Sequence, residues 1–289
     1  MGRAYAAITV VTVLWAINFT VGKRCTAVID PFFIASFRII VTGLAFYAFL
    51  PREERKIRAS DWKAILPLSV SGILTNHVCF AWGISKTTPS HSAVIHAIFP
   101  VFVGIVAWVF IRERQGPMAL LGMAVAVAGA LIVVIGATRN EVSKTIAGDL
   151  ISAVGVLSFS FYTVFGRKAV QEMSSRRVVT LAFLFASPLL VPFLIYGILR
   201  QPSWSTVPMR GWLELAYMLF FANMIAYLLH SYALKKLRAG QVAAFTDLQP
   251  ALGIGVAVLA GEDHLTATLA VGAAVALLGV VLVQLRPST

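Results

Sequence analysis

Polar and aromatic side chains recur at helical spacing inside long apolar segments of this 289-residue chain. In segment 215–234, Asn223, Tyr227 and His230 occupy positions i, i+4 and i+7, which share one face of a helix. The chain has no HExxH, nucleotide loop, serine nucleophile elbow or acidic metal cluster. The chemistry these side chains can do is therefore hydrogen bonding and aromatic contact to a small molecule, with no catalytic residues.

A second patch of the same kind lies 150 residues earlier. Segment 64–85 carries Asn76, His77 and Phe80, with Trp82 further on. Under a shift of 150, His77 meets Tyr227 and Phe80 meets His230. Both halves of the chain thus place polar and aromatic groups at corresponding positions, as a shared central cavity would require.

Other spans add further candidates. His96 follows Ser92 by four residues, and Trp15 and Phe19 flank Asn18, which corresponds to Tyr162 under a shift of 144. Polar groups within a bilayer usually face protein or a water-filled cavity. The alternatives are interhelical hydrogen bonding and packing and, for the aromatics, interfacial belts. The predicted substrate-binding set is Asn18, Asn76, His77, Phe80, Trp82, His96, Tyr162, Asn223, Tyr227 and His230.

Two charges interrupt otherwise apolar stretches. Arg38 lies within 31–50, where it either stabilises the fold by bonding helix ends or clamps a substrate carboxylate. Asp247 lies within 239–261, three residues before Pro250, where it either binds a substrate amine or exchanges a proton, or else has a purely structural role. The stretch 239–261, which is the copy of the span that contains Ser92 and His96, also carries Thr246.

Prolines and glycines mark bends and close contacts. Pro100 and Pro250 each remove a helical hydrogen bond near mid-span, which predicts either a gating kink or a fixed bend. Small residues on one stripe of a helix permit close backbone approach, so we expect two stripes to pack spans five and ten together. These glycines are Gly122, Gly129, Gly136, Gly272 and Gly279.

The elements that must position these residues are membrane-spanning helices. Only 12% of residues are charged, against about 25% in soluble proteins, and 59% are hydrophobic. Stretches 31–50 and 239–261 contain one charge each, and eight windows of 17 to 25 residues contain none: 4–22, 64–85, 87–111, 115–138, 150–166, 178–199, 215–234 and 264–285. Because a spanning helix needs about 20 apolar residues, we predict an all-α integral membrane protein with ten transmembrane helices.

The positive charge is distributed unevenly between the two sides. The side holding both termini carries 16 of the 24 Lys and Arg residues, and the other side carries 7. The positive-inside rule therefore predicts cytoplasmic N- and C-termini in a cytoplasmic (inner) membrane. The formal net charge of +12 is then an orientation signal, so no nucleic acid partner is expected. Cys25 and Cys79 match no metal or redox spacing, so neither a metal nor a cofactor is predicted.

The chain also repeats itself. Residues 82–89 resemble 232–239 and Pro100 meets Pro250 under the shift of 150, whereas near the start of each half the shift is 144. Two units follow, 1–138 and 145–289, each of five spans. Because five is odd, the second unit must enter the membrane inverted relative to the first. Inverted repeats around a central cavity are a recurring plan of secondary transporters.

Three sequence motifs carry a family resemblance: W-A-x-N-F-x-x-G-K at 15–23, P-F-F-I-A-S-F-R at 31–38, and A-W-G-I-S…P-V-F…R-E-R…G-M…G at 81–129 with a copy at 232–279. The chain resembles the drug/metabolite transporter superfamily in its EamA branch, and within it the YddG-type exporters of aromatic amino acids and metabolites. The resemblance implies export of a small-molecule substrate by alternating access, in contact with membrane lipids. The sequence leaves the oligomeric state open, although it is compatible with a monomer. The family pattern also has the arginine at position 38, which favours its structural role. In one departure, the second copy reads Gly-Glu-Asp-His at 261–264 where the first has Arg-Glu-Arg.

Several other functions stay open from sequence. The substrate could be another drug or metabolite, such as an organic cation or a nucleotide-type compound. A membrane-embedded enzyme that modifies lipids is a different class, against which the missing catalytic motifs argue. A passive channel is a third, disfavoured by the repeat and by the lack of a charged ring.

Overall fold

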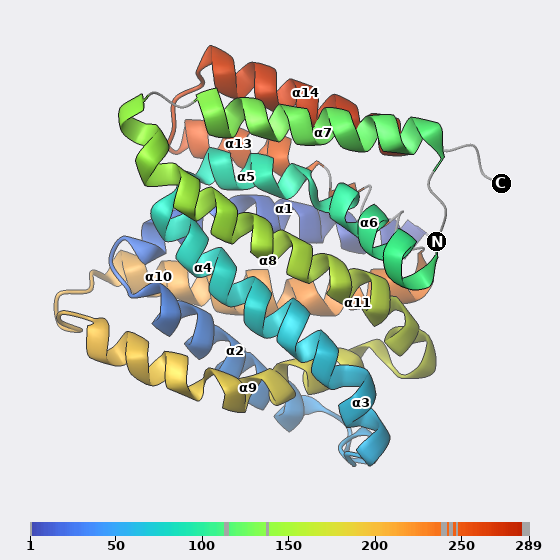
Figure 1. Cartoon of the computed structure of the whole chain (residues 1–289). Coiled ribbons are helices and arrows are strands. Elements are labelled where there is room, and N and C mark those ends of the chain that lie inside the picture. The colour runs from blue at the N-terminus through green and yellow to red at the C-terminus, as the bar shows by residue number, and fades with distance from the viewer. Residues whose placement is uncertain are drawn as a thin grey trace.

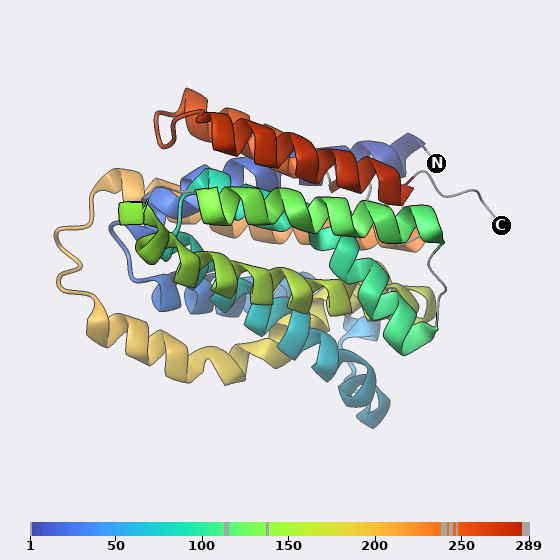
Figure 2. The same ribbon diagram turned by 45° about the horizontal axis from the view of Figure 1, so that its top comes forward.

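The computed structural model describes residues 2–112, 116–136, 139–237, 242, 245–246 and 248–284, and every regular element in these ranges is a helix (Figure 1). Asp247 lies outside the described residues. Helix α1 begins and α14 ends at the same end of the bundle, on the right of Figures 1 and 2.

The first half starts its helices at prolines and caps. Asp30 accepts a hydrogen bond of 2.8 Å from the Phe32 backbone N–H, and Pro31 occupies the first turn, where its missing N–H costs nothing. The elements are α1 (Gly2–Thr26), α2 (Pro31–Phe49), η1 (Arg52–Glu54), α3 (Ala59–Leu68), η2 (Ser69–Thr75), α4 (Asn76–Lys86), α5 (Pro89–Ala97), α6 (Phe99–Ile111) and α7 (Pro117–Gly136).

The second half follows a similar order. Ser174 caps the helix that begins at Ser175, because its side chain accepts a hydrogen bond of 3.2 Å from the Arg177 backbone N–H. The elements are α8 (Arg139–Glu172), α9 (Ser175–Arg200), α10 (Met209–Tyr217), η3 (Met218–Ile225), α11 (Ala226–Lys236), α13 (Gln249–Leu259) and α14 (Ala267–Gln284).

Eight helical segments of the described chain are long and apolar enough to cross a bilayer. Two further apolar helices, Gln249–Leu259 and Ala267–Leu282, are shorter. Large apolar side chains lie exposed on the outside of the bundle, as in Leu199 at 78% and Leu259 at 90%. Such a surface suits lipid rather than water. The chain therefore forms several membrane-spanning helices, while the count of ten stays a prediction.

Two wide π-helical turns interrupt long helices at corresponding places. The turn η2 joins α3 to α4, and η3 joins α10 to α11. A shift of 150 moves Ser69–Thr75 onto 219–225, which coincides with η3 to one residue. The apolar periodicity did not reveal these turns, because a π turn adds one residue without changing composition.

The prolines singled out in the sequence lie at helix starts. The predicted span 87–111 is split, because α5 ends at Ala97 and α6 begins at Phe99 with Pro100 in its first turn. Pro250 has the equivalent place in the first turn of α13, which begins at Gln249. The helix of this span is thus interrupted at Ile98, and the role of the two prolines stays a prediction.

Helices α7 and α14 lie side by side along one edge of the bundle (Figure 2). A Cβ atom added at Gly129 would lie 2.2 Å from the Ala276 nitrogen, and one added at Gly279 would lie 2.2 Å from the Ala126 nitrogen. These two contacts exchange places under the shift of 150. The glycine stripes therefore pack these two helices together, as expected from their spacing.

Helices α2 and α9 pack together at the opposite edge, and α1, α4, α8 and α11 lie between the two pairs (Figure 1). A Cβ added at Gly43 would lie 2.9 Å from the Ser187 hydroxyl oxygen. A shift of 144 moves Gly43 onto Ser187 itself. Both edge pairs thus join corresponding elements of the two halves.

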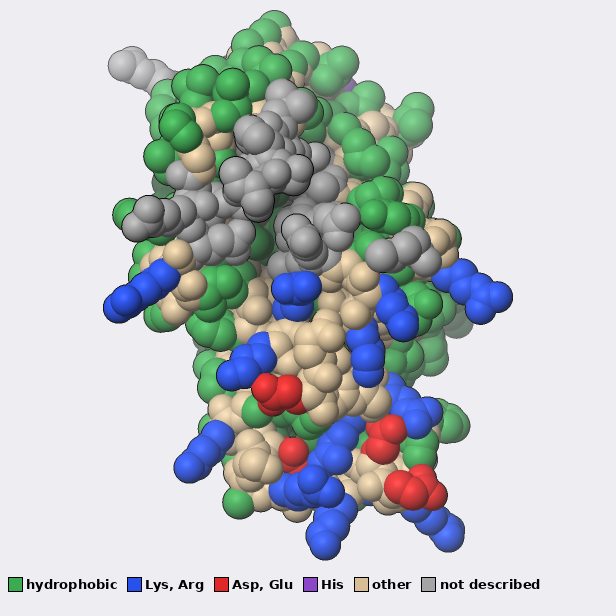
Figure 3. Space-filling model, turned by 90° about the vertical axis from the view of Figure 1, so that its right-hand side faces the viewer, with side chains coloured by type: hydrophobic (Ala, Val, Ile, Leu, Met, Phe, Trp, Pro, Cys, Tyr) green, Lys and Arg blue, Asp and Glu red, His purple; other side chains and the backbone are tan. Residues whose placement is uncertain are grey.

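Lys and Arg side chains gather at the end of the bundle where α1 begins and α14 ends, hereafter the basic face (Figure 3). Arg177 pairs with Asp61 there at 2.7 Å, and Arg176 pairs with Glu54 at the same distance. The hydrogen bond from Arg176 lowers the pKa of Glu54, and a hydrogen bond from Ser174 adds to it. These contacts join η1 and α3 to the start of α9.

Candidate functional site

A cavity of about 70 Å³ lies among helices of both halves. One water molecule needs roughly 10–15 Å³, so the cavity holds a few waters. Its position is central, since Asn223 lies near the middle of the 28-residue segment Met209–Lys236. The lining residues are Trp15, Asn18, Arg38, Asn76, His77, Phe80, His96, Phe99, Val156, Phe159, Ala222, Asn223, Tyr227, Thr246 and Gln249.

The structure brings most of the sequence-predicted set to this one cavity. Seven of its members contribute to the lining, together with Arg38: Asn18, Asn76, His77, Phe80, His96, Asn223 and Tyr227. They come from α1, α2, α4, α5, η3 and α11, and the outermost of them, Asn18 and Tyr227, are 209 residues apart in the sequence. Convergent polar groups among aromatic walls are typical of small-molecule sites.

Asn223 is the hub of the polar groups. Arg38 Nη2 donates a hydrogen bond to Asn223 Oδ1, and His77 Nε2 lies 3.2 Å from the same oxygen. His77 Nδ1 lies 2.9 Å from the Ile73 carbonyl oxygen. A neutral imidazole donates through only one ring nitrogen, so it satisfies one of these two oxygens at a time.

Arg38 is a buried cation in this hub. Its exposed fraction is 2%, and its Nε and Nη1 atoms have no hydrogen-bond partner among the described residues. The ion pairs formed within the described ranges do not include it. Its guanidinium therefore keeps most of its hydrogen-bonding capacity.

The two π turns supply carbonyl groups that link the halves. Tyr227 Oη donates to the Gly72 carbonyl at 3.4 Å, and Trp15 Nε1 donates to the Ala222 carbonyl at 2.9 Å. Gly72 and Ala222 correspond under the shift of 150. Because a π turn releases carbonyls from the regular helical pattern, each can accept a bond from the other half. Both donor rings are thereby fixed at the cavity wall.

The rest of the wall is aromatic and apolar. The Phe159 ring centroid lies 5.6 Å from those of Trp15 and Phe99. Sequence reasoning left out Phe99, Val156, Phe159, Ala222 and Gln249. Two of these carried a usable signal, because Phe159 corresponds to Trp15 under the shift of 144 and Gln249 is a polar residue next to Pro250.

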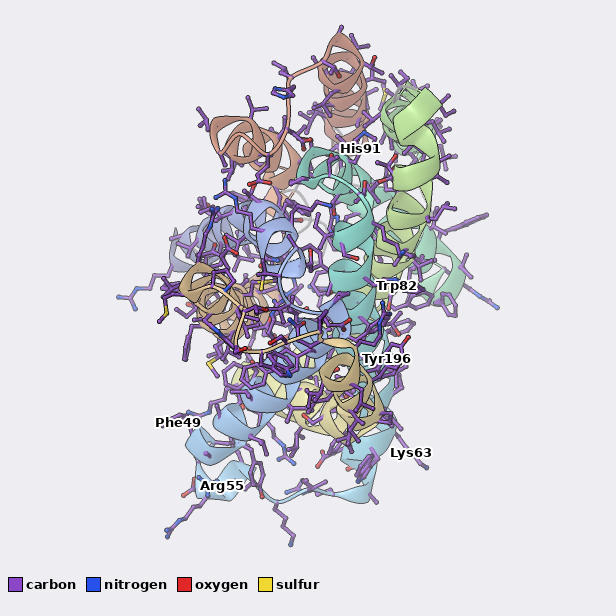
Figure 4. All side chains as sticks on the ribbon, turned by 90° about the vertical axis from the view of Figure 1, so that its left-hand side faces the viewer. Phe49, Arg55, Lys63, Trp82, His91 and Tyr196 are labelled. Atoms are coloured by element: carbon purple, nitrogen blue, oxygen red, sulfur yellow. The ribbon has the colours of Figure 1, made fainter. Side chains whose placement is uncertain are left out.

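The remaining predicted residues do not line the cavity. Tyr162 and His230 are buried one layer behind it, with the His230 ring 5.3 Å from Trp15 and 5.5 Å from Phe159. Trp82 lies at the periphery and, like Tyr196, packs against Phe32 (Figure 4). Pro100 and Pro250 are buried outside the lining.

Polar contacts also join the halves at the end opposite the basic face. Arg24, one to two turns beyond Asn18 on α1, pairs with Glu262 and donates to the Ala260 carbonyl at 2.7 Å. The Ser90 backbone N–H donates to Asp263 at 2.8 Å. The acidic departure from the repeat noted at 261–264 is thus used for contacts with α1 and α5.

These features describe a helical membrane protein built around a central polar and aromatic cavity. The EamA-like transporter family model matches residues 2–135 and again 146–285, so the chain belongs to the EamA-like transporter family. This confirms the resemblance drawn from the motifs.

Curated relatives agree with this membership, and a solved structure shares the fold. A probable amino-acid metabolite efflux pump of Salmonella typhimurium is 25% identical over 87% of this chain and 85% of its own. A probable terminal-alkyne amino-acid exporter of Streptantibioticus cattleyicolor is 26% identical over 99% and 95%. An uncharacterized transporter of Archaeoglobus fulgidus is 24% identical over 86% of each chain. A crystal structure with 17% identity superposes with a TM-score of 0.70 over 97% of each chain, which shows a shared fold.

Proposed function

We propose that the chain exports small metabolites, amino acids and related compounds among them, by alternating access through the central cavity. The observation that carries this proposal is the cavity itself, where Asn223, His77 and Arg38 meet aromatic rings from both halves. Two relatives named for amino-acid or metabolite efflux support the substrate range. A cavity of about 70 Å³ must widen to admit such a molecule, and alternating access supplies that change.

The proposal includes ten spans arranged as two inverted five-helix units, 1–138 and 145–289. It is supported by the exchange of Gly129 and Gly279 contacts under the shift of 150 and by the matching π turns. We place the basic face in the cytoplasm because positive residues favour that side. Substrate then enters from the basic face and leaves past the contacts of Arg24 and Asp263.

The site in this proposal consists of the lining residues, with Tyr162 and His230 holding the aromatic wall from behind. Asp247, which the sequence singles out, belongs to the proposal as a proton carrier or a partner for a substrate amine. Pro100 and Pro250 are proposed hinges, because each begins a helix at the corresponding place in its half.

A counterflow assay in proteoliposomes tests the proposal. Liposomes preloaded with unlabelled amino acids and aromatic metabolites, one at a time, should accumulate the same labelled compound transiently, with saturation. The same panel with and without a pH gradient decides between proton coupling and facilitated diffusion. Absence of counterflow across the panel, with purified folded protein, would contradict the proposal.

A further inference from the structure

We propose that Arg38 binds the carboxylate of the transported molecule, so that the cavity takes small carboxylic acids, amino acids among them, rather than organic cations. The inference rests on the proposed function and names the substrate class of the same cavity. It assigns Arg38 to recognition, whereas the family pattern favoured a structural role.

The first support is the electrostatic state of Arg38. A buried ion without a counter-charge is costly in a bilayer, because water no longer solvates it. Arg38 is 2% exposed, and its only hydrogen bond in the described chain goes to Asn223. Two acidic groups of the described chain are engaged elsewhere, since Asp30 lies 3.8 Å from Arg200 and Glu214 pairs with Arg210. An incoming carboxylate would supply the missing counter-charge.

The second support is the surplus of donors beside Arg38. Asn223 uses its oxygen to accept from Arg38 and leaves its Nδ2 group without a partner in the described chain. A planar guanidinium and an amide N–H₂ are groups that suit a carboxylate. Among the described lining residues Arg38 is the one Lys, Arg, Asp or Glu side chain, so this part of the wall favours an anionic group over an organic cation.

The third support is that Arg38 has no counterpart in the other half. The shift of 144, which relates Gly43 to Ser187 at the α2–α9 contact, moves Arg38 onto Ala182. Ala182 is fully buried. The packing of these two helices therefore needs no arginine at this level. A residue that binds one end of an asymmetric substrate is needed in only one half, so it need not recur in the other half.

Three probes of one size test the inference on the unaltered full-length protein: L-phenylalanine, 3-phenylpropionate and 2-phenylethylamine. The second carries only the carboxylate and the third only the amine. We expect phenylalanine and phenylpropionate to bind purified protein, and to show counterflow, with affinities within about tenfold of each other. Phenylethylamine should bind at least 30-fold more weakly than phenylpropionate.

Two variants sharpen the test. Arg38→Gln should weaken phenylpropionate binding at least 10-fold, and Arg38→Lys should restore part of it because the positive charge remains. Asn223→Asp places a carboxylate on Arg38 where the substrate carboxylate would bind. It should leave the protein folded, weaken phenylpropionate binding at least 10-fold, and not weaken phenylethylamine binding. Arg52→Gln, which removes an exposed positive charge, is the matched control and should change nothing.

The outcomes separate the two proposals. Equal or stronger binding of phenylethylamine, or unchanged selectivity in folded Arg38→Gln protein, overturns the carboxylate assignment while transport stands. Equal loss of all three probes in folded Arg38→Gln and Arg38→Lys overturns it too, because Arg38 then acts only through structure. If none of these probes or the metabolite panel moves in counterflow, the proposed function fails and the inference fails with it.

Discussion

The two halves of the chain share their scaffold and differ in their cavity walls. Gly129 and Gly279 make equivalent contacts, and the π turns η2 and η3 present equivalent carbonyls at Gly72 and Ala222. In the cavity the correspondence of chemistry ends. Each of four pairs of corresponding positions has at least one member in the cavity lining, and the two residues differ in every pair: Arg38 and Ala182, Ile73 and Asn223, His77 and Tyr227, and Phe80 and His230.

The difference teaches which residues each role requires. A contact that holds two related helices together is made once from each half, so it needs the same small residue in both. A site for one asymmetric molecule needs different groups on its two sides. We therefore expect substitutions at two corresponding shared positions to impair folding equally. A substitution at an unshared position should change substrate binding in one half alone.

The largest effect is expected at the shared glycines. Gly129→Leu and Gly279→Leu each drive a side chain into the backbone of the partner helix, because a Cβ atom at either position would lie 2.2 Å from a backbone nitrogen of that helix. Overpacking typically costs about 1–3 kcal/mol, and a backbone clash more. Both variants should lose most of the folded protein in detergent, measured by size-exclusion chromatography. Gly255→Leu, with no atom within 4 Å, is the control. Normal folding of either variant would contradict the shared-scaffold account.

Asn223→Ile gives the second half the residue of the first at this position. Arg38 and His77 then lose their shared acceptor, and a hydrogen bond to a charged group is worth about 1.5–3 kcal/mol. Thermal unfolding of the purified protein should show a loss of that size. An unchanged melting temperature would mean that the hub adds no stability.

Trp15→Phe makes the first half match Phe159 and removes one bond between halves. The Nε1–H donor to the Ala222 carbonyl is lost, while the aromatic ring stays. Because a neutral hydrogen bond is worth about 1 kcal/mol, we expect roughly a fivefold change in substrate affinity. Counterflow at varied substrate concentration measures it. Trp82→Phe, at the periphery, should leave affinity unchanged, and equal effects of both would argue against the assigned wall.

His230→Phe gives the second half the residue of the first at that position. Neither His230 ring nitrogen has a hydrogen-bond partner in the described chain, so a phenyl ring should replace the imidazole with under about a threefold change in transport. His230→Ala instead removes the support behind Trp15 and Phe159 and should impair transport more. Equal, large losses in both would show that the imidazole itself takes part.

The smallest effect is expected on the basic face, away from the shared scaffold. The pKa of Glu54 is lowered by Arg176, so its contribution to stability is present above its ordinary value and is lost as pH falls through the lowered one. The Arg176 side chain is exposed, so solvent screens this pair and its effect on stability is small. Melting temperatures of wild-type and Glu54→Gln protein should differ slightly at pH 7, and the difference should disappear as the pH is lowered through the lowered pKa of Glu54. A constant difference would exclude this linkage.

Much of the scaffold could be predicted from sequence, because it rests on composition and repetition. Charge-free windows predicted helices such as α1 and α7, and the glycine spacing predicted the α7–α14 contact. The π turns were not predicted, since the extra residue per turn is set by packing. Gly72, for example, lies where a Cβ would come within 2.3 Å of the Tyr162 ring.

The cavity was predictable only in part. Polar residues in apolar spans, such as His77 and Asn223, stand out because burial of a polar group needs a reason. Apolar lining residues such as Val156 look like any other residue of a buried helix, so only the fold places them at the cavity. Trp82 shows the converse, since an aromatic ring in a span fits a cavity and a periphery equally well.

Access to the cavity from both sides of the membrane is the most direct test of the account. With Cys25 and Cys79 replaced by serine, Val156→Cys places one thiol in the cavity wall. A membrane-impermeant thiol reagent should modify it in right-side-out and in inside-out vesicles, because alternating access opens the cavity to each side in turn. Modification from only one side, or from neither, would contradict the account.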